Sequence, residues 1–135
     1  MKGIGVHSGA ETSLTLRPAE VGAGIRFRRV DLDGAPEIPA TLSNVVGSDL
    51  GTSLGVGDAR AMTVEHVMAA LYAYGIDNCI LDLDGPEPPI GDGSFHPYAE
   101  AILEAGIEEQ SEPAAVLQIT EALSVDADNG ERYVA

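Results

Sequence analysis

The segment from Thr63 to Tyr74 constrains the fold most, because its apolar residues recur at helical spacing. Placed on a helix, these residues form one stripe about 100° wide: Val64, Val67, Met68 and Leu71. Thr63 can cap the N-terminus of this helix, and Gly75 can end it. An amphipathic helix must bury its stripe, so the rest of the chain has to supply a partner surface.

Segments before and after this helix have the pattern of strands. Polar and apolar residues alternate over 13–17 and 25–28, with Leu14 and Leu16 on one face of the first segment. Gly22 and Gly24 mark the turn between them. Residues 34–61 predict short strands and loops, and residues 79–83 predict a further strand.

A second helix is predicted over residues 95–105, with Ser94 as its cap and Gly106 as its end. The polar segment 108–113 is the best candidate for a linker. Beyond it, residues 116–119 and 122–125 have the composition of strands, and Asn129-Gly130 predicts a hairpin turn.

Composition excludes several classes of protein. The chain has 135 residues, of which 44% are apolar, so it can build one packed core. Its formal charge of −15 argues against nucleic-acid binding and against anionic membrane surfaces. No apolar run is long enough to span a bilayer or to form a signal peptide. A single cysteine, Cys79, fits a reducing compartment, so we expect a cytoplasmic protein.

The charge is unevenly distributed along the sequence. Residues 1–30 carry a net charge of +3, whereas residues 31–135 carry −18. Much of the basic patch lies on the predicted strand 25–28 or directly after it, at Arg26, Arg28 and Arg29. These arginines either form a solvated strand face or attract an anionic ligand.

The face of the first helix opposite its apolar stripe carries an unusual set of residues. It presents three alanines together with the adjacent pair Glu65 and His66. The dipole at a helix N-terminus favours an ionised carboxylate and disfavours a protonated imidazole. A neutral imidazole can bind a metal ion and a carboxylate can accept a proton, which are the two requirements of zinc-dependent hydrolysis.

A purely structural interpretation of this pair stays open. Glu65 and His66 in a first helical turn can simply support the cap and the dipole, and the alanines fit a helix packed on both sides. His7 and His96 have no assigned role, and Asp92 most simply forms a turn before the second helix. The glycines of segment 3–9 are spaced wrongly for a dinucleotide-binding fingerprint.

The sequence resembles the first half of the LpxC-type zinc deacetylases, which remove the N-acetyl group from UDP-3-O-acyl-N-acetylglucosamine in lipid A synthesis. The resemblance extends in order along nearly the whole chain. The matching stretches are Gly3–Gly9, Leu14–Ala19, Phe27–Asp31, Thr63–His66, Gly75–Asn78, Pro86–Ile90 and Asp92–Ser94. The segment around residues 50–53 departs from the family, which often has a cysteine there.

The resemblance implies an α+β fold: a two-layer sandwich of a β-sheet and two helices, the first of two similar domains with the active site between them. Residues 1–110 would form this domain, and residues 111–135 a linker with the opening strands of a truncated second domain. By the same resemblance, Glu65 is the general base and His66 a ligand of Zn²⁺. The other zinc ligands would lie in the second domain, so the 135 residues alone are expected to be an inactive fragment.

The expected substrate is therefore a UDP-linked acylated amino sugar, and no oligomeric state follows from the sequence. The competing hypothesis is a non-catalytic α+β binding or interaction domain, in which Glu65 and His66 are structural.

Overall fold

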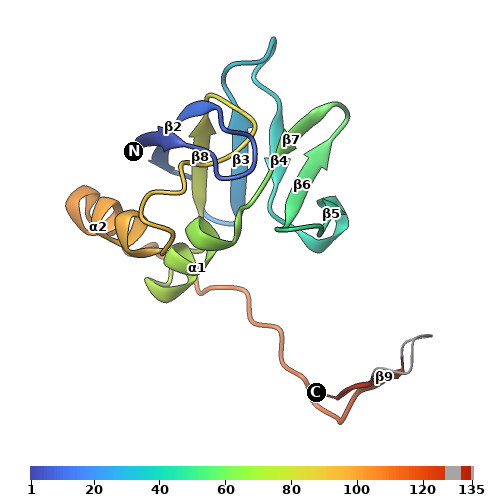
Figure 1. Ribbon diagram of the computed structural model, residues 1–135. Helices are drawn as coiled ribbons and strands as arrows, with labels where there is room; N and C mark the ends of the chain where they lie inside the picture. Colours follow the sequence, from blue (N-terminus) through green and yellow to red (C-terminus); the bar gives the residue numbers. More distant parts are fainter. Residues whose placement is uncertain (127–131, 135) are drawn as a thin grey trace.

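The computed structural model describes residues 1–126 and 132–134 of the chain. Its main sheet has five strands in the order β1-β2-β8-β3-β4 (Figure 1). The strands are β1 (Lys2–Ile4), β2 (Glu11–Pro18), β8 (Cys79–Leu83), β3 (Ile25–Arg29) and β4 (Glu37–Pro39). Strands β3 and β8 run parallel, and the other neighbours are antiparallel. The predicted strands at 13–17, 25–28 and 79–83 are thus confirmed.

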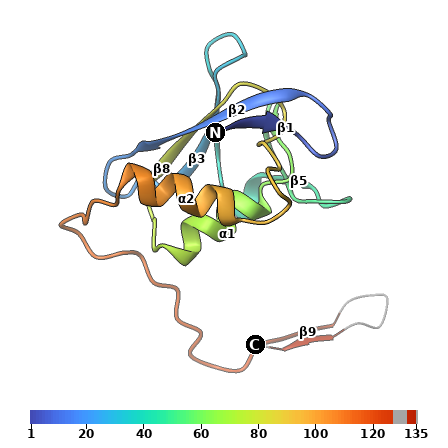
Figure 2. The same ribbon diagram turned by 60° about the vertical axis from the view of Figure 1, so that its left-hand side comes forward.

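Two helices, α1 (Glu65–Ala73) and α2 (His96–Ala105), lie together on one face of this sheet (Figure 2). Between β4 and α1 the chain forms a short 3-10 turn (Leu42–Asn44) and a three-stranded sheet. The strands of that sheet are β5 (Val45–Gly47), β6 (Ser53–Val56) and β7 (Ala59–Ala61). One sheet layer and one helix layer give the expected α+β sandwich.

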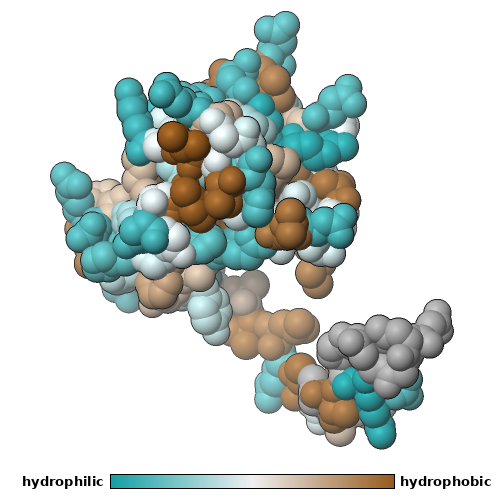
Figure 3. All heavy atoms as spheres, in the orientation of Figure 1, coloured by the Kyte–Doolittle hydropathy of each residue, from teal (hydrophilic) through white to brown (hydrophobic). Residues whose placement is uncertain are grey.

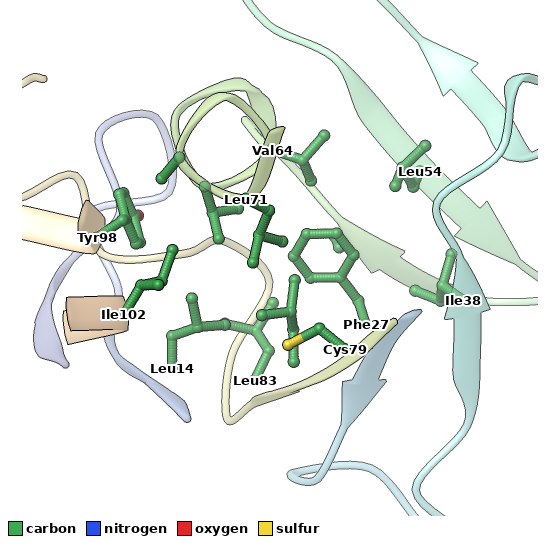
Figure 4. Close-up of a cluster of buried hydrophobic side chains, with 14 of the residues drawn as sticks. Leu14, Phe27, Ile38, Leu54, Val64, Leu71, Cys79, Leu83, Tyr98 and Ile102 are labelled. Carbon is green, nitrogen blue, oxygen red and sulfur yellow. The ribbon is translucent and has the colours of Figure 1, made fainter. Parts of the chain in front are cut away.

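The core fills the space between the sheet and the helices (Figure 4). Leu71 of α1 and Tyr98 of α2 pack toward Leu14 and Phe27 of the sheet, and all four side chains are buried. The predicted stripe of α1 faces this core, with Met68 only partly buried. Cys79 is buried there as well, and burial raises the pKa of its thiol.

The other face of the sheet is polar and held by ion pairs. The register places Arg28 beside Asp82 on the neighbouring strand, and their side chains approach to 2.6 Å. Asp82 also receives a hydrogen bond from Arg17. The bond from Arg28 lowers the pKa of Asp82 most, and together with Arg17 it outweighs the effect of burial. The carboxylate therefore stays ionised although its side chain is only 9% exposed.

The remaining arginines of the basic segment are paired too. Arg26 lies 3.3 Å from Glu37 of β4. Arg29 is buried, where it pairs with Asp31 and donates to the carbonyl of Arg60 at 2.6 Å. These pairs favour the structural interpretation of the arginines over a free anion-binding patch.

The predicted cap of the first helix is wrong. The helix begins at Glu65, its N-cap residue is Val64, and Thr63 lies outside it with a backbone φ of +51°. The hydroxyl of Thr63 binds elsewhere, as described below. Gly75, by contrast, follows the helix end with the positive φ expected of a terminating glycine.

The second helix agrees with the prediction to within one residue at its start. The predicted cap is wrong, because the N-cap residue is Phe95 and no side chain caps the helix. The hydroxyl oxygen of Ser94, one residue earlier, accepts the backbone N–H of His96 at 3.1 Å. Gly106 is the C-cap and has a φ of +84°.

Beyond α2 the chain leaves the sandwich as an extended segment (Figure 3). The predicted strand at 116–119 is wrong, because no neighbouring strand supplies hydrogen bonds to it among the described residues. The second predicted strand is confirmed in part as β9 (Ser124–Asp126), which pairs with β10 (Arg132–Val134). The predicted turn at Asn129-Gly130 lies outside the described residues.

Within residues 1–126 and 132–134, no helix combines the length and the apolar character that crossing a membrane requires.

Phe27→Ala should lower the free energy of unfolding by about 3–5 kcal/mol, because it leaves a cavity between β3 and the helices. Denaturant titration measures this loss. Tyr72→Ala is the control, since that side chain on α1 is 90% exposed; its effect should stay within about 0.5 kcal/mol. Equal effects of the two substitutions would contradict the assignment of the core.

Asp82→Asn should destabilise the chain most at neutral pH. The pKa of Asp82 is lower in the folded than in the unfolded chain, so its stabilising effect is complete above the unfolded value and declines as the pH falls below about 4. The gap in unfolding free energy between the native chain and the variant should therefore narrow in acid. Denaturant titrations at pH 7 and pH 3 test this; a constant gap would contradict it.

Candidate functional site

The first turn of α1 carries Glu65 and His66, and Glu65 lies beside the loop that precedes β6. Oε1 of Glu65 accepts the backbone N–H of Thr52. Partial burial alone would raise the pKa of this carboxyl, but the N–H groups of Thr52 and of Glu65 itself outweigh it. The net pKa lies below the ordinary value, so Glu65 is ionised near neutral pH and able to accept a proton.

His66 is half-buried, and its Nδ1 atom is fully buried without a hydrogen-bond partner among the described residues. A buried polar atom with no partner is uncommon in a folded protein and calls for an explanation. An imidazole nitrogen of this kind has a lone pair available to a metal ion. In the described part of the chain, however, no three His, Cys, Asp or Glu side chains gather in a way that could hold one.

The most buried acidic side chain near this pair is Glu87, which is 0% exposed. Its carboxylate accepts the N–H of Ser8 at 2.8 Å, the N–H of His7 at 3.1 Å and the hydroxyl of Thr63 at 2.6 Å. Burial would raise the pKa of Glu87, yet these donors outweigh it and lower the pKa. No described Lys, Arg or His forms an ion pair with Glu87, so hydrogen bonds alone stabilise its charge.

Thr63 connects this buried carboxylate to α1. Because its hydroxyl donates to Glu87, it does not cap the helix. Its backbone lies in the left-handed region, where residues with a Cβ atom are uncommon. The structure therefore uses Thr63 to fix the point at which the chain enters the helix two residues before Glu65.

The loop at residues 50–52 is held from two sides. On one side, Nε2 of His7 lies 3.1 Å from the carbonyl oxygen of Leu50. On the other, the N–H of Thr52 donates to Glu65, and its carbonyl accepts the N–H of Val64 at 3.3 Å. The structure thus brings His7, which had no assigned role, into the same network as Glu65.

The other candidates lie outside this network. His96 contacts Glu100 one turn further along α2, at 3.4 Å on the exposed surface. Asp92 accepts both the N–H and the hydroxyl of Ser94, which is the predicted turn. Of the three alanines opposite the stripe of α1, Ala70 is buried and the other two are exposed.

Sequence patterning did not single out Glu87. In the residue pattern it is one acid between prolines in residues 86–89, which by itself indicates a turn, and the family resemblance over Pro86–Ile90 assigns it no role. The loop at residues 50–52 is marked in the sequence only by its turn composition and by its departure from the family pattern. Both are defined by contacts between segments far apart in the sequence, which periodicity does not detect.

Comparison with known proteins assigns the chain to a family. The family model described as "LpxC: UDP-3-O-acyl N-acetylglycosamine deacetylase" matches residues 1–135. UDP-3-O-acyl-N-acetylglucosamine deacetylases of Myxococcus xanthus and of Geobacter sp. strain M21 are 51% and 50% identical to the chain, over 93% and 91% of its length. The bifunctional enzyme LpxC/FabZ of Chlorobaculum tepidum is 48% identical over 99% of the chain.

The chain spans 40% of the Myxococcus and Geobacter proteins and 28% of the Chlorobaculum protein. At this identity, and with a match over its whole length, the chain belongs to the LpxC family of UDP-3-O-acyl-N-acetylglycosamine deacetylases.

Proposed function

We propose that this chain supplies the general base and one zinc ligand of an enzyme that deacetylates a UDP-linked 3-O-acyl-N-acetylglucosamine in lipid A biosynthesis. The observation that carries the proposal is the first turn of α1. There an ionised Glu65 adjoins His66, whose buried Nδ1 atom has no partner among the described residues. The family of the chain and the names of its relatives support the reaction and the substrate class.

His66 fits one position of a zinc site, because an imidazole nitrogen without a competing hydrogen bond is a good ligand. A catalytic zinc ion usually has three protein ligands and an open position for water. Since the described residues provide one candidate, the remaining ligands would come from the part of the relatives that this chain does not span. Residues 1–110 would then form one domain, and residues 111–135 would lead into another.

When bound, zinc would polarise the acetamide carbonyl and hold the attacking water. Glu65 would accept a proton from that water as its oxygen attacks the carbonyl carbon. The bond between this carbon and the nitrogen then breaks, and a proton has to reach the leaving nitrogen. The products are acetate and a free amino group on the sugar.

The diphosphate of such a substrate needs cationic partners, and the paired arginines of the sheet are poor candidates. Arg26, Arg28 and Arg29 each already have a carboxylate partner on their own sheet or turn. The proposal therefore does not assign the diphosphate to these three arginines. It also places the enzyme in the cytoplasm, with no nucleic acid as a partner, in keeping with the strongly negative charge of the chain.

Glu65→Gln should lower kcat about 100-fold or more, because the amide cannot accept the proton of the attacking water. The test uses a chimera in which this chain replaces the matching segment of the Geobacter relative, with acetate release as the measurement. Glu104→Gln on the exposed face of α2 is the matched control and should leave kcat unchanged. The bound metal content of the Glu65→Gln chimera should stay near that of the unmodified chimera. Near-normal turnover would remove Glu65 from this role.

The 135-residue chain alone should bind zinc weakly and release no acetate, because one imidazole does not make a catalytic site. Calorimetric titration and metal analysis after dialysis measure the binding. His66→Ala should remove whatever weak binding α1 contributes, whereas His96→Ala should not. Tight binding of one zinc ion per chain would contradict the division of ligands proposed above.

A further inference from the structure

Glu87 is a buried ionised group that the proposed reaction does not use. An uncompensated buried charge strongly destabilises a protein, so such a group persists only where its surroundings satisfy it. Here the compensation comes from backbone N–H groups and one hydroxyl rather than from a cation among the described residues. Donors of this kind have fixed directions, so the carboxylate fixes the backbone segments that carry them.

Two of these donors belong to the loop after β1. The N–H groups of His7 and Ser8 point at Glu87. The end of β1 itself adjoins the segment before α2, since the N–H of Ile90 donates to the carbonyl oxygen of Ile4 at 2.9 Å. A Cβ atom on Gly5 would lie 2.4 Å from Oε2 of Glu87. The close approach therefore requires glycine at this position.

The third donor belongs to the start of α1. The hydroxyl of Thr63 binds Glu87 while its backbone holds a left-handed conformation immediately before the helix. A Cβ atom on Gly51 would lie 3.3 Å from this hydroxyl oxygen, so the loop at residues 50–52 packs directly against Thr63. The loop at residues 50–52 is hydrogen-bonded by His7 on one side and by Glu65 on the other. Glu87 binds the segments that carry both of these residues.

We propose that Glu87 is a positioning residue, whose carboxylate fixes the loop at residues 5–9 and the entry to α1 so that Glu65 keeps its place against Thr52. The proposal rests on the proposed function, since it concerns the geometry of the same base. Glu87 acts through Thr63, His7 and Ser8 and does not itself touch the reacting atoms. Losing an ordinary buried group would destabilise the whole chain. Losing the Glu87 carboxylate should instead loosen mainly the loop at residues 5–9, the entry to α1 and the contact between Thr52 and Glu65.

The test compares Glu87→Gln with Asp82→Asn. Both replace a buried, hydrogen-bonded carboxylate by its amide, but Asp82 lies on the polar face of the sheet, away from the helices. In the chimera, Glu87→Gln should lower kcat about tenfold or more with little change in KM, because small displacements of a catalytic group cost rate. Asp82→Asn, assayed well below its unfolding temperature, should keep kcat.

A second measurement does not depend on activity. In the 135-residue chain, Glu87→Gln should speed amide hydrogen exchange at Thr52, Ser8 and His7 while the paired amides of β2 and β8 keep their protection. Thr63→Val, which lacks the hydroxyl, should act in the same direction, and Thr63→Ser should restore the native behaviour. The double variant with Thr63→Val and Glu87→Gln should lose less free energy of unfolding than the two single variants lose together. The reason is that both substitutions break the same contact.

Unchanged exchange at Thr52 in Glu87→Gln would overturn the proposal, and so would a uniform loss of protection matching that of Asp82→Asn. A Glu87→Gln chimera with native kcat would overturn it as well. An inactive unmodified chimera, or full activity of Glu65→Gln, would instead contradict the proposed function and leave the exchange measurement to decide the role of Glu87.

Discussion

The carboxylate of Glu87 meets hydrogen-bond donors on two sides and no charged partner among the described residues. Such a group is stable only when every donor is in place, and here the donors come from the loop after β1 and from the residue that leads into α1. This requirement keeps both segments in fixed positions. With these two segments fixed, His7 and Glu65 meet the same short loop from opposite sides.

The main sheet separates two kinds of stabilisation. Its inner face buries apolar side chains against the helices, and its outer face holds arginines against carboxylates on neighbouring strands. This division explains the uneven charge of the sequence. The arginines that make residues 1–30 basic serve as counter-ions for acids from later segments, including Asp82 and Glu37, so the basic patch disappears on folding.

The layered fold was largely predictable because its signals are local. Alternation located β2 and β3, helical spacing located α1, and glycines marked where both helices end. Features that depend on distant partners were not predictable in this way. Thr63 has the chemistry of a helix cap, but its hydroxyl binds Glu87, which lies 24 residues further along the chain. Likewise, residues 116–119 have the composition of a strand, but no neighbouring strand accompanies them in the described part of the chain.

In the candidate site, too, local features were predictable and contacts between distant residues were not. Adjacent Glu65 and His66 on one helix were recognisable from the sequence, since helix position and residue type are enough to identify a possible base and ligand. The anchoring of that helix was not, because Glu87 lies in a proline-rich turn whose composition indicates only a loop. A resemblance to a family could supply the roles of the pair, whereas the contacts that hold the pair in place required the folded chain.

Close contacts link the beginning of the chain to the segment before α2. A Cβ atom on Gly3 would lie 3.0 Å from Pro89, and one on Gly5 would collide with Glu87. Residues 3–8 therefore support the site as well as the sheet. When boundaries are chosen for producing this protein, a deletion that extends through Ser8 would remove two of the donors that neutralise a buried negative charge.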